Sequence, residues 1–317
     1  MKNIGKLMLK IAIFLFVIGS LLFTISMSIN KWDFSKLSTS RLETNTHQIT
    51  EEFNNISIDT DTADIIFVYS NENKVVLREY EDCNHFVSVD NDTLKISYSV
   101  KDNWFKNLIS FKEPMITIYL TETEFENLNI KEDTGDIRIP RDFKMKNVDI
   151  EASTGDVYYF SSSESIKITL STGDIEMNNV TTNSLELVTS TGEIELSNIT
   201  CINDIKITTS TGDVSIEDVK CNNLTSKGTT SDLEMENVLV TNKLSIIRDT
   251  GDVEFDRCDA SEIYIKTSTG DVEGTLLSDK VFIVDTNTGI KDYPKSTTGG
   301  KCEIKTSTGD IKIRIIK

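Results

Sequence analysis

The chain has 317 residues, with 51 Asp and Glu against 33 Lys and Arg, and a formal net charge of −18. This acidic balance argues against a nucleic-acid partner, because phosphate binding needs a basic surface. Two histidines, five scattered cysteines and no cofactor fingerprint leave no pattern typical of a catalytic centre. We therefore expect a protein without enzymatic activity, since activity is argued from a site.

An apolar segment lies close to the N-terminus. Residues 1–10 contain three lysines, and residues 11–29 then run without a charge. As a helix, the uncharged segment spans about 28 Å, the thickness of a bilayer core. It predicts a single-pass anchor in the cell membrane, with residues 1–10 cytoplasmic and the rest of the chain extracytoplasmic. A cleaved signal peptide is the alternative, although no Ala-x-Ala-like site follows. Residues 30–50 are polar, which predicts a linker.

A turn of Thr, Gly and an acid, followed by Ile or Val, recurs along the chain. Its glycines are Gly135, Gly155, Gly173, Gly192, Gly212, Gly251, Gly270 and Gly309. Ser231 replaces the glycine once, and Gly289 belongs to a turn that lacks the acid. Successive turn positions are 18 to 20 residues apart, a regularity that indicates stacked copies of one unit. Glycine at a fixed turn position predicts positive φ there.

The segments between the turns alternate apolar and polar residues. Ile205-Lys-Ile207 precedes one turn and Val214-Ser-Ile216 follows it, a period of two that is typical of half-buried strands. We predict an all-β, single-stranded β-solenoid of about ten coils, right-handed on base rate, with main-chain hydrogen bonds between coils. Regular coils are expected over 128–317. Residues 51–127 are less regular and predict divergent coils that cap the rod.

A second corner in each coil carries two further ladders. The first is Val180, Ile199, Val219, Val238 and Cys258, and the second is Thr182, Cys201, Cys221, Val240 and Ala260. Cys201 and Cys221 therefore fall in adjacent coils. We expect small buried hydrophobes there, with a disulfide between the two coils as the alternative.

Two segments depart from the repeat. Aromatic and aliphatic residues between Trp104 and Phe111 predict a plug over the first coil, with a short membrane-contacting helix as the alternative. The stretch 286–300 holds Pro294 and the acid-less turn, and it predicts a loop protruding from the penultimate coil. Residues 311–317 then predict a last strand that nothing covers, with its basic residues as edge protection.

The recurring acid of the turn has two interpretations. An Asp after Gly can accept hydrogen bonds from main-chain N–H groups and fix the turn. The alternative is calcium binding along the stacked edge, because calcium takes several oxygen ligands. Its weak candidates are Asp156, Asp174, Glu193, Asp213, Asp252 and Asp271. No cofactor is otherwise expected.

The Thr-Gly-Asp-Ile/Val turn between Ile-x-Ile strands resembles a bacterial family of unknown function known as the putative adhesins. The coil Ile56–Ile65, the strand Met115–Leu120 and the turn Thr134–Ile137 carry the same resemblance, which covers about residues 50–317. The resemblance implies a β-solenoid that is exported or tethered to the membrane. The resembled family includes an anchored member of the Lia envelope-stress operon. The resemblance implies no catalytic residue.

Three functions follow as expectations. The first is a non-enzymatic scaffold or binding module in the cell envelope, with an envelope protein or glycan as partner. The second is a calcium-dependent solenoid that uses the acidic turns. The third is a carbohydrate-active β-helix enzyme, which would need a local pair of carboxylates rather than one acid per coil.

Overall fold

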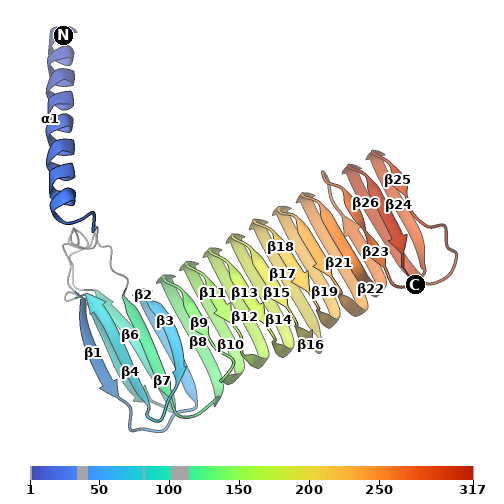
Figure 1. Ribbon diagram of the computed structural model, residues 1–317. Coiled ribbons are helices and arrows are strands. Elements are labelled where there is room, and N and C mark those ends of the chain that lie inside the picture. The colour runs from blue at the N-terminus through green and yellow to red at the C-terminus, as the bar shows by residue number, and fades with distance from the viewer. Residues whose placement is uncertain (1, 34–41, 81–82, 101–113, 317) are drawn as a thin grey trace.

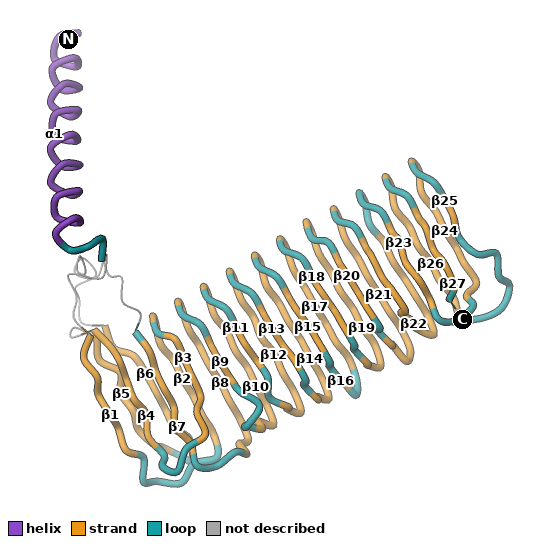
Figure 2. Tube along the Cα trace, in the orientation of Figure 1, coloured by secondary structure: helices purple, strands orange, loops and turns teal. Residues whose placement is uncertain are grey.

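The computed structural model describes residues 2–33, 42–80, 83–100 and 114–316 (Figure 1). Within these ranges it contains one helix, α1 (Lys2–Ile29), and a rod built from 27 strands. Short loops join the strands along both edges of the rod, as Figure 2 shows. The rod is a β-solenoid of about nine turns, which confirms the predicted fold with one turn fewer than the ten expected.

The strands form two sheets, called here A and B. Sheet A contains, in spatial order, β1 (Leu42–Gln48), β4 (Lys74–Tyr80), β7 (Met115–Leu120), β3 (Asp64–Tyr69), β9 (Ile137–Ile139), β11 (Val157–Tyr159), β13 (Ile175–Asn178), β15 (Ile194–Ser197), β18 (Val214–Glu217), β20 (Leu233–Glu236), the first part of β22 (Val253–Lys266), β23 (Val272–Leu276), β27 (Ile311–Ile315) and β25 (Lys291–Asp292). Sheet B contains β5 (Cys83–Asp90), β6 (Thr93–Val100), β2 (Asn55–Thr62), β8 (Glu124–Thr134), β10 (Lys144–Thr154), β12 (Ser162–Thr172), β14 (Thr181–Thr191), β16 (Thr200–Cys201) with β17 (Asp204–Thr211), β19 (Lys220–Thr230), β21 (Leu239–Thr250), the second part of β22, β26 (Gly300–Thr308) and β24 (Lys280–Thr288).

One apolar core runs through the whole stack. The buried residues form a single cluster from Phe53 to Ile313. In β14, for example, Leu185 and Leu187 are buried while Glu186 between them is exposed, which is the alternation read from the sequence. Because neighbouring coils stack in register, each inward row of Leu, Ile and Val continues from one coil to the next.

The N-terminal end of the rod is closed by antiparallel strands. The coil of β2 and β3 pairs directly with β8 and β9 on one side, and β6 and β7 pair with its other side. There β4 is antiparallel to β7, and β5 to β6. The sequence predicted a linker over residues 30–50. Residues 42–48 of this stretch instead form the strand β1, which is antiparallel to β4. Among the described residues this strand pairs with β4 alone, and its mostly exposed polar side chains gave no apolar alternation to detect. The predicted plug between Trp104 and Phe111 lies outside the described residues.

The coils at the C-terminal end are not stacked in chain order. β26 lies between β22 and β24, and β27 lies between β23 and β25. The coil of β24 and β25 is therefore outermost (Figure 1). Residues 293–299 lead the chain back, and β26 and β27 then form the coil between this outermost coil and β22 with β23. Two predictions were wrong here. The coil with the acid-less turn is not penultimate, and the last strand β27 is covered by β25.

The helix α1 has the properties of a membrane span. Met8–Ile29 is long and apolar enough to cross a bilayer, and none of its most apolar 18-residue window is buried. Large apolar side chains such as Phe16 and Leu22 are more than half exposed. A membrane anchor and a signal sequence both fit this finding.

Candidate functional site

The Thr-Gly-acid turn forms a continuous ladder along one edge of the rod. The repeat glycines from Gly135 to Gly309 have φ between 122° and 154°. A Cβ atom at any of them would lie 1.9 to 2.2 Å from the carbonyl oxygen of the turn stacked against it. Glycine is required twice over, by its backbone conformation and by the close approach of the next coil.

The acids of this ladder bind the neighbouring coil. Asp174 Oδ1 accepts a hydrogen bond of 2.7 Å from the main-chain N–H of Glu193, and Asp252 Oδ1 does the same for Asp271. Such bonds, of 2.7 to 3.0 Å, also use Asp64, Asp136, Asp156, Asp213, Asp232, Asp271 and Asp310 as acceptors. Among the described residues, no group of three or more His, Cys, Asp or Glu side chains is placed to hold a metal ion. Of the six calcium candidates, five thus have an oxygen bonded to the next coil, and Glu193 is the exception.

The turn without an acid stands where the ladder ends. Ile290 donates its N–H to Asp310 Oδ1 at 2.8 Å, but it offers no carboxylate in return. Its coil is outermost, so no further coil of the described chain needs that acceptor. The lapse in the repeat therefore marks the end of the stack.

The turn with Ser231 is one part of a linked set of exceptions. In the inward row beside the turns, Arg248 is 1% exposed and occupies a place that several other coils fill with Thr, such as Thr189 and Thr209. Its guanidinium donates to Ser226 Oγ at 2.8 Å and to the Ile247 carbonyl at 3.0 Å. Burial lowers the pKa of Arg248 to about 10. In the adjacent coil Gly228 makes room, because a Cβ there would lie 2.8 to 3.0 Å from Ser231 and Arg248 atoms.

The second corner has a conformational requirement that the sequence analysis missed. The residue before each member of the first ladder is left-handed, with φ of 53° to 58° at Asn179, Asn198, Asp218 and Asn237, and 50° at Arg257. Asn and Asp tolerate this conformation best among residues with a side chain, so their recurrence before Val or Ile was an available signal. Every member of both corner ladders is buried, as predicted. Cys201 and Cys221 are free thiols, and burial raises the pKa of Cys221 to about 12.

A buried polar cluster lies at the N-terminal end of the rod. Glu79 Oε2 bonds His85 Nδ1 at 2.8 Å, and His85 Nε2 bonds the Thr60 hydroxyl at 2.8 Å. Asn45 of β1 donates to Glu79 Oε1 at 2.8 Å. Thr60, Glu79 and His85 are each less than a tenth exposed, so the cluster ties β1, β2, β4 and β5 together from inside. Sequence reasoning could not find it, because its members lie between residues 45 and 85 at spacings that do not repeat.

Glu132 extends this cluster along sheet B, opposite Thr60. Its Oε1 accepts hydrogen bonds of 3.2 Å from the N–H groups of Ala63 and Thr134, while Oε2 has no partner in the described part of the chain. Burial raises the pKa of Glu132 to about 8, and the charges of Asp61 and Asp133 add to the effect. The carboxyl group is therefore mostly protonated at neutral pH.

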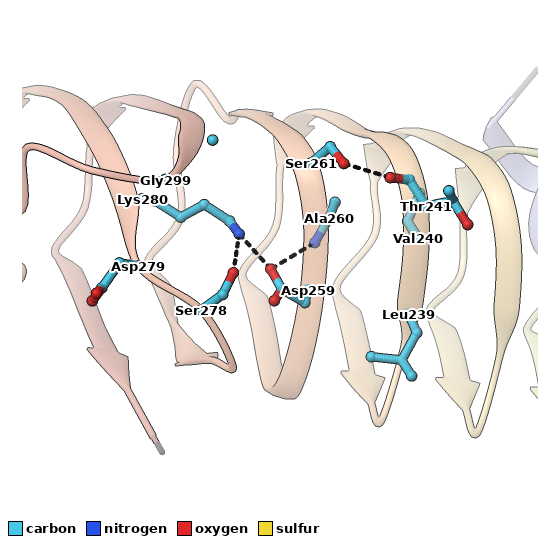
Figure 3. Close-up of a pocket in the computed structure, with 11 residues that line it drawn as sticks. Leu239, Val240, Thr241, Asp259, Ala260, Ser261, Ser278, Asp279, Lys280 and Gly299 are labelled. Atoms are coloured by element: carbon cyan, nitrogen blue, oxygen red, sulfur yellow. Dashed lines mark hydrogen bonds and ion pairs between the residues drawn. The ribbon is translucent and has the colours of Figure 1, made fainter.

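The rod carries a groove of about 630 Å³ near its C-terminal end (Figure 3). Lys280 lies in it, 3% exposed, with Nζ 2.5 Å from Asp259 Oδ1 and from Ser278 Oγ. Lys280 is opposite Gly300 in the sheet, and the absence of a side chain there lets the lysine reach past β26 to β22. The ion pair fastens the outermost coil across the coil inserted beneath it.

The sequence matches the family described as Toastrack DUF4097 over residues 53–201, 158–238 and 200–317. A solved putative adhesin from Parabacteroides merdae is 16% identical, with a TM-score of 0.47 and coverage of 74% of this chain and 96% of that one. A putative lipid binding protein from Parabacteroides distasonis is 17% identical, with a TM-score of 0.43 and the same coverage of both chains. A putative cell adhesion protein from Clostridium sporogenes is 12% identical, with a TM-score of 0.22, covering 87% of this chain and all of that one. No curated protein matches. The family matches together span the solenoid, and the chain belongs to the Toastrack DUF4097 family.

Proposed function

We propose that this protein is a membrane-anchored binding module of the cell envelope and not an enzyme. The observation that carries the proposal is the hydrogen bonding of the turn acids, which recur from coil to coil. Nearly all of them are engaged in hydrogen bonds between coils, so the repeat builds a rigid rod rather than a row of reactive carboxylates. A rod of stacked coils offers long, regular outer faces to a protein or glycan partner.

The anchor in this proposal is α1, with the solenoid on the extracytoplasmic side. The apolar span 8–29 follows lysines at the N-terminus, which favours a cytoplasmic N-terminus. We extend the proposal to envelope stress, because the turn motif resembles that of the anchored member of the Lia operon.

The full chain in its own membranes tests the anchor. We expect a C-terminal tag to be cut by external protease in whole cells, and the protein to stay in membranes after a carbonate wash at its full mass. The variant Phe16→Lys puts a charge in the middle of the span, at a cost of about 3 kcal/mol, and should reduce membrane retention. A mature chain that lacks residues 1–29 would contradict the anchor, and a tag reached only after lysis would contradict the orientation.

Binding and catalysis are tested with the same full chain in detergent micelles. We expect it to retain an envelope protein or a cell-wall glycan and to leave that glycan intact. Cleavage of a cell-wall or acidic polysaccharide, detected as new reducing ends, would contradict the non-enzymatic assignment.

A further inference from the structure

We infer that the C-terminal tip of the rod, residues 279–316, pairs with the tip of a second copy of this chain through the free edge of β24. The two strands would run antiparallel across a twofold axis and join two rods end to end. This goes beyond the proposed binding function, because it assigns a surface and its occupant.

The edge of β24 is open and poorly protected. In the described part of the chain β24 pairs with β26 on one side, and nothing pairs with its other side. It is nine residues long and has no proline, and Val281 and Ile283 are 39% and 47% exposed. Edge strands normally carry charges, prolines or bulges that prevent such pairing. The edge strand β1 at the other end, with sequence LETNTHQ, is polar by comparison.

The fold also indicates the direction of the missing strand. A further parallel coil would lack the carboxylate acceptor that the preceding turn supplies elsewhere in the ladder, because that turn carries Ile290. At the N-terminal end, antiparallel strands close both sheets, β4 on β7 and β5 on β6. The tip has no such strand among the described residues. An antiparallel strand on β24 would therefore close the tip in the same way that antiparallel strands close the N-terminal end of the rod.

The sequence of β24 is complementary to itself in one register. If Ile283 lies opposite its own copy, the side chains alternate correctly and Phe282 lies opposite Val284 on the inward face. Phe282 and Val284 are only half-buried and pack against the end of the core, so the partner would cover them. Asp285 then faces Val281, and no two like charges are opposed. A contact of this kind is isologous and closes as a dimer.

The charge distribution favours contact between two tips over contact between two flanks, and salt distinguishes a tip-to-tip contact from a contact of a tip with an acidic flank. Residues 279–317 contain eight Lys or Arg and five Asp or Glu, a net charge of +3, which leaves −21 on residues 1–278. Two acidic flanks would repel each other strongly, whereas two tips repel weakly. Salt should therefore tighten a dimer held by the tips, and it would weaken a contact between a tip and an acidic flank.

Sedimentation of the full chain in density-matched detergent micelles tests the inference. We expect a monomer–dimer equilibrium that shifts toward dimer as salt is raised. Ile283→Lys places two lysines opposite each other and should raise the dissociation constant at least tenfold. Ile202→Lys is the matched control, because Ile202 is 62% exposed but lies on a central coil, and it should change nothing. The variant Ile283→Cys should form a dimer with a bifunctional maleimide in native membranes, at a level that wild type and Ile202→Cys do not reach.

Three results would overturn the inference. The first is a wild-type chain that stays monomeric up to about 100 μM, well above the usual range of specific association. The second is a dimer that Ile283→Lys leaves intact, which would place the contact elsewhere, for example in α1. The third is a dimer that dissociates as salt is raised.

Discussion

Replacing Gly192 by alanine should separate two coils of the rod. Gly192 has φ of 139°, and a Cβ there would lie 2.0 Å from the Gly173 carbonyl oxygen and 2.5 Å from its carbon. A normal contact needs about 3.4 Å, so the two turns must move apart by more than 1 Å. That movement breaks the bond of 2.9 Å from Gly173 N–H to the Thr191 carbonyl and weakens its neighbour between Ile175 N–H and the Glu193 carbonyl.

The cost follows from these terms. Two main-chain hydrogen bonds contribute about 1 kcal/mol each, and a side chain at this φ adds about 1–2 kcal/mol of strain. We expect Gly192→Ala to lower the free energy of unfolding by about 3–4 kcal/mol. The matched control is Asn198→Ala in the following second corner, where φ is 56° and the native residue already carries a Cβ atom. Losing the left-handed preference of Asn should cost about 1 kcal/mol.

Urea unfolding of the full chain in micelles, followed by circular dichroism in the β-sheet region, measures both variants. Hydrogen exchange should also show faster exchange of the amides of residues 173–175 and 192–194 in Gly192→Ala, with little change in distant coils. Equal urea midpoints for wild type and Gly192→Ala would refute the argument that the close approach of coils demands glycine. A loss no larger than that of Asn198→Ala would show that φ alone matters.

Four further predictions concern charged groups. The pKa of Glu132 is raised in the fold to about 8, so its stabilising effect is complete at low pH and is lost as pH rises through 8. The free energy of unfolding should therefore fall by about 2 kcal/mol between about pH 6.5 and about pH 9. Glu132→Gln should remove that part of the pH dependence in urea titrations. Asp174→Ala removes the acceptor for Glu193 N–H and should cost about 1 kcal/mol, whereas Asp174→Asn keeps an oxygen there and should cost less. Millimolar calcium should leave the thermal midpoint of wild type unchanged, and a rise of many degrees would instead support the calcium alternative. Lys280→Met leaves Asp259 without its cation and should cost about 3 kcal/mol, seen as faster hydrogen exchange confined to β24 and β25; unchanged exchange there would contradict the role of the ion pair as a fastener.

Much of the rod could be predicted because its signals are local. Each Thr-Gly-acid turn specifies its own backbone conformation, and each Ile-x-Ile segment specifies its own inward face. These patterns repeat at a nearly constant period, so ten weak signals support one another. The corner asparagines were equally local and could have been recognised. The cluster of Glu79, His85 and Thr60 could not, because only the folding of the N-terminal strands around one another brings these residues together.

By itself the sequence determined the coil, namely its turn, its two strands, its buried rows and the apolar helix before them. Only the tertiary structure decided the order in which the coils stack. Main-chain hydrogen bonds between coils do not depend on side chains, so any coil of the right period fits against any other. The choice at the C-terminal end is made by particular side-chain contacts. Lys280 reaches Asp259 over Gly300, and Phe282 packs on Tyr293 with ring centroids 5.8 Å apart. Such contacts do not belong to the repeat, so the periodicity of the sequence does not predict them.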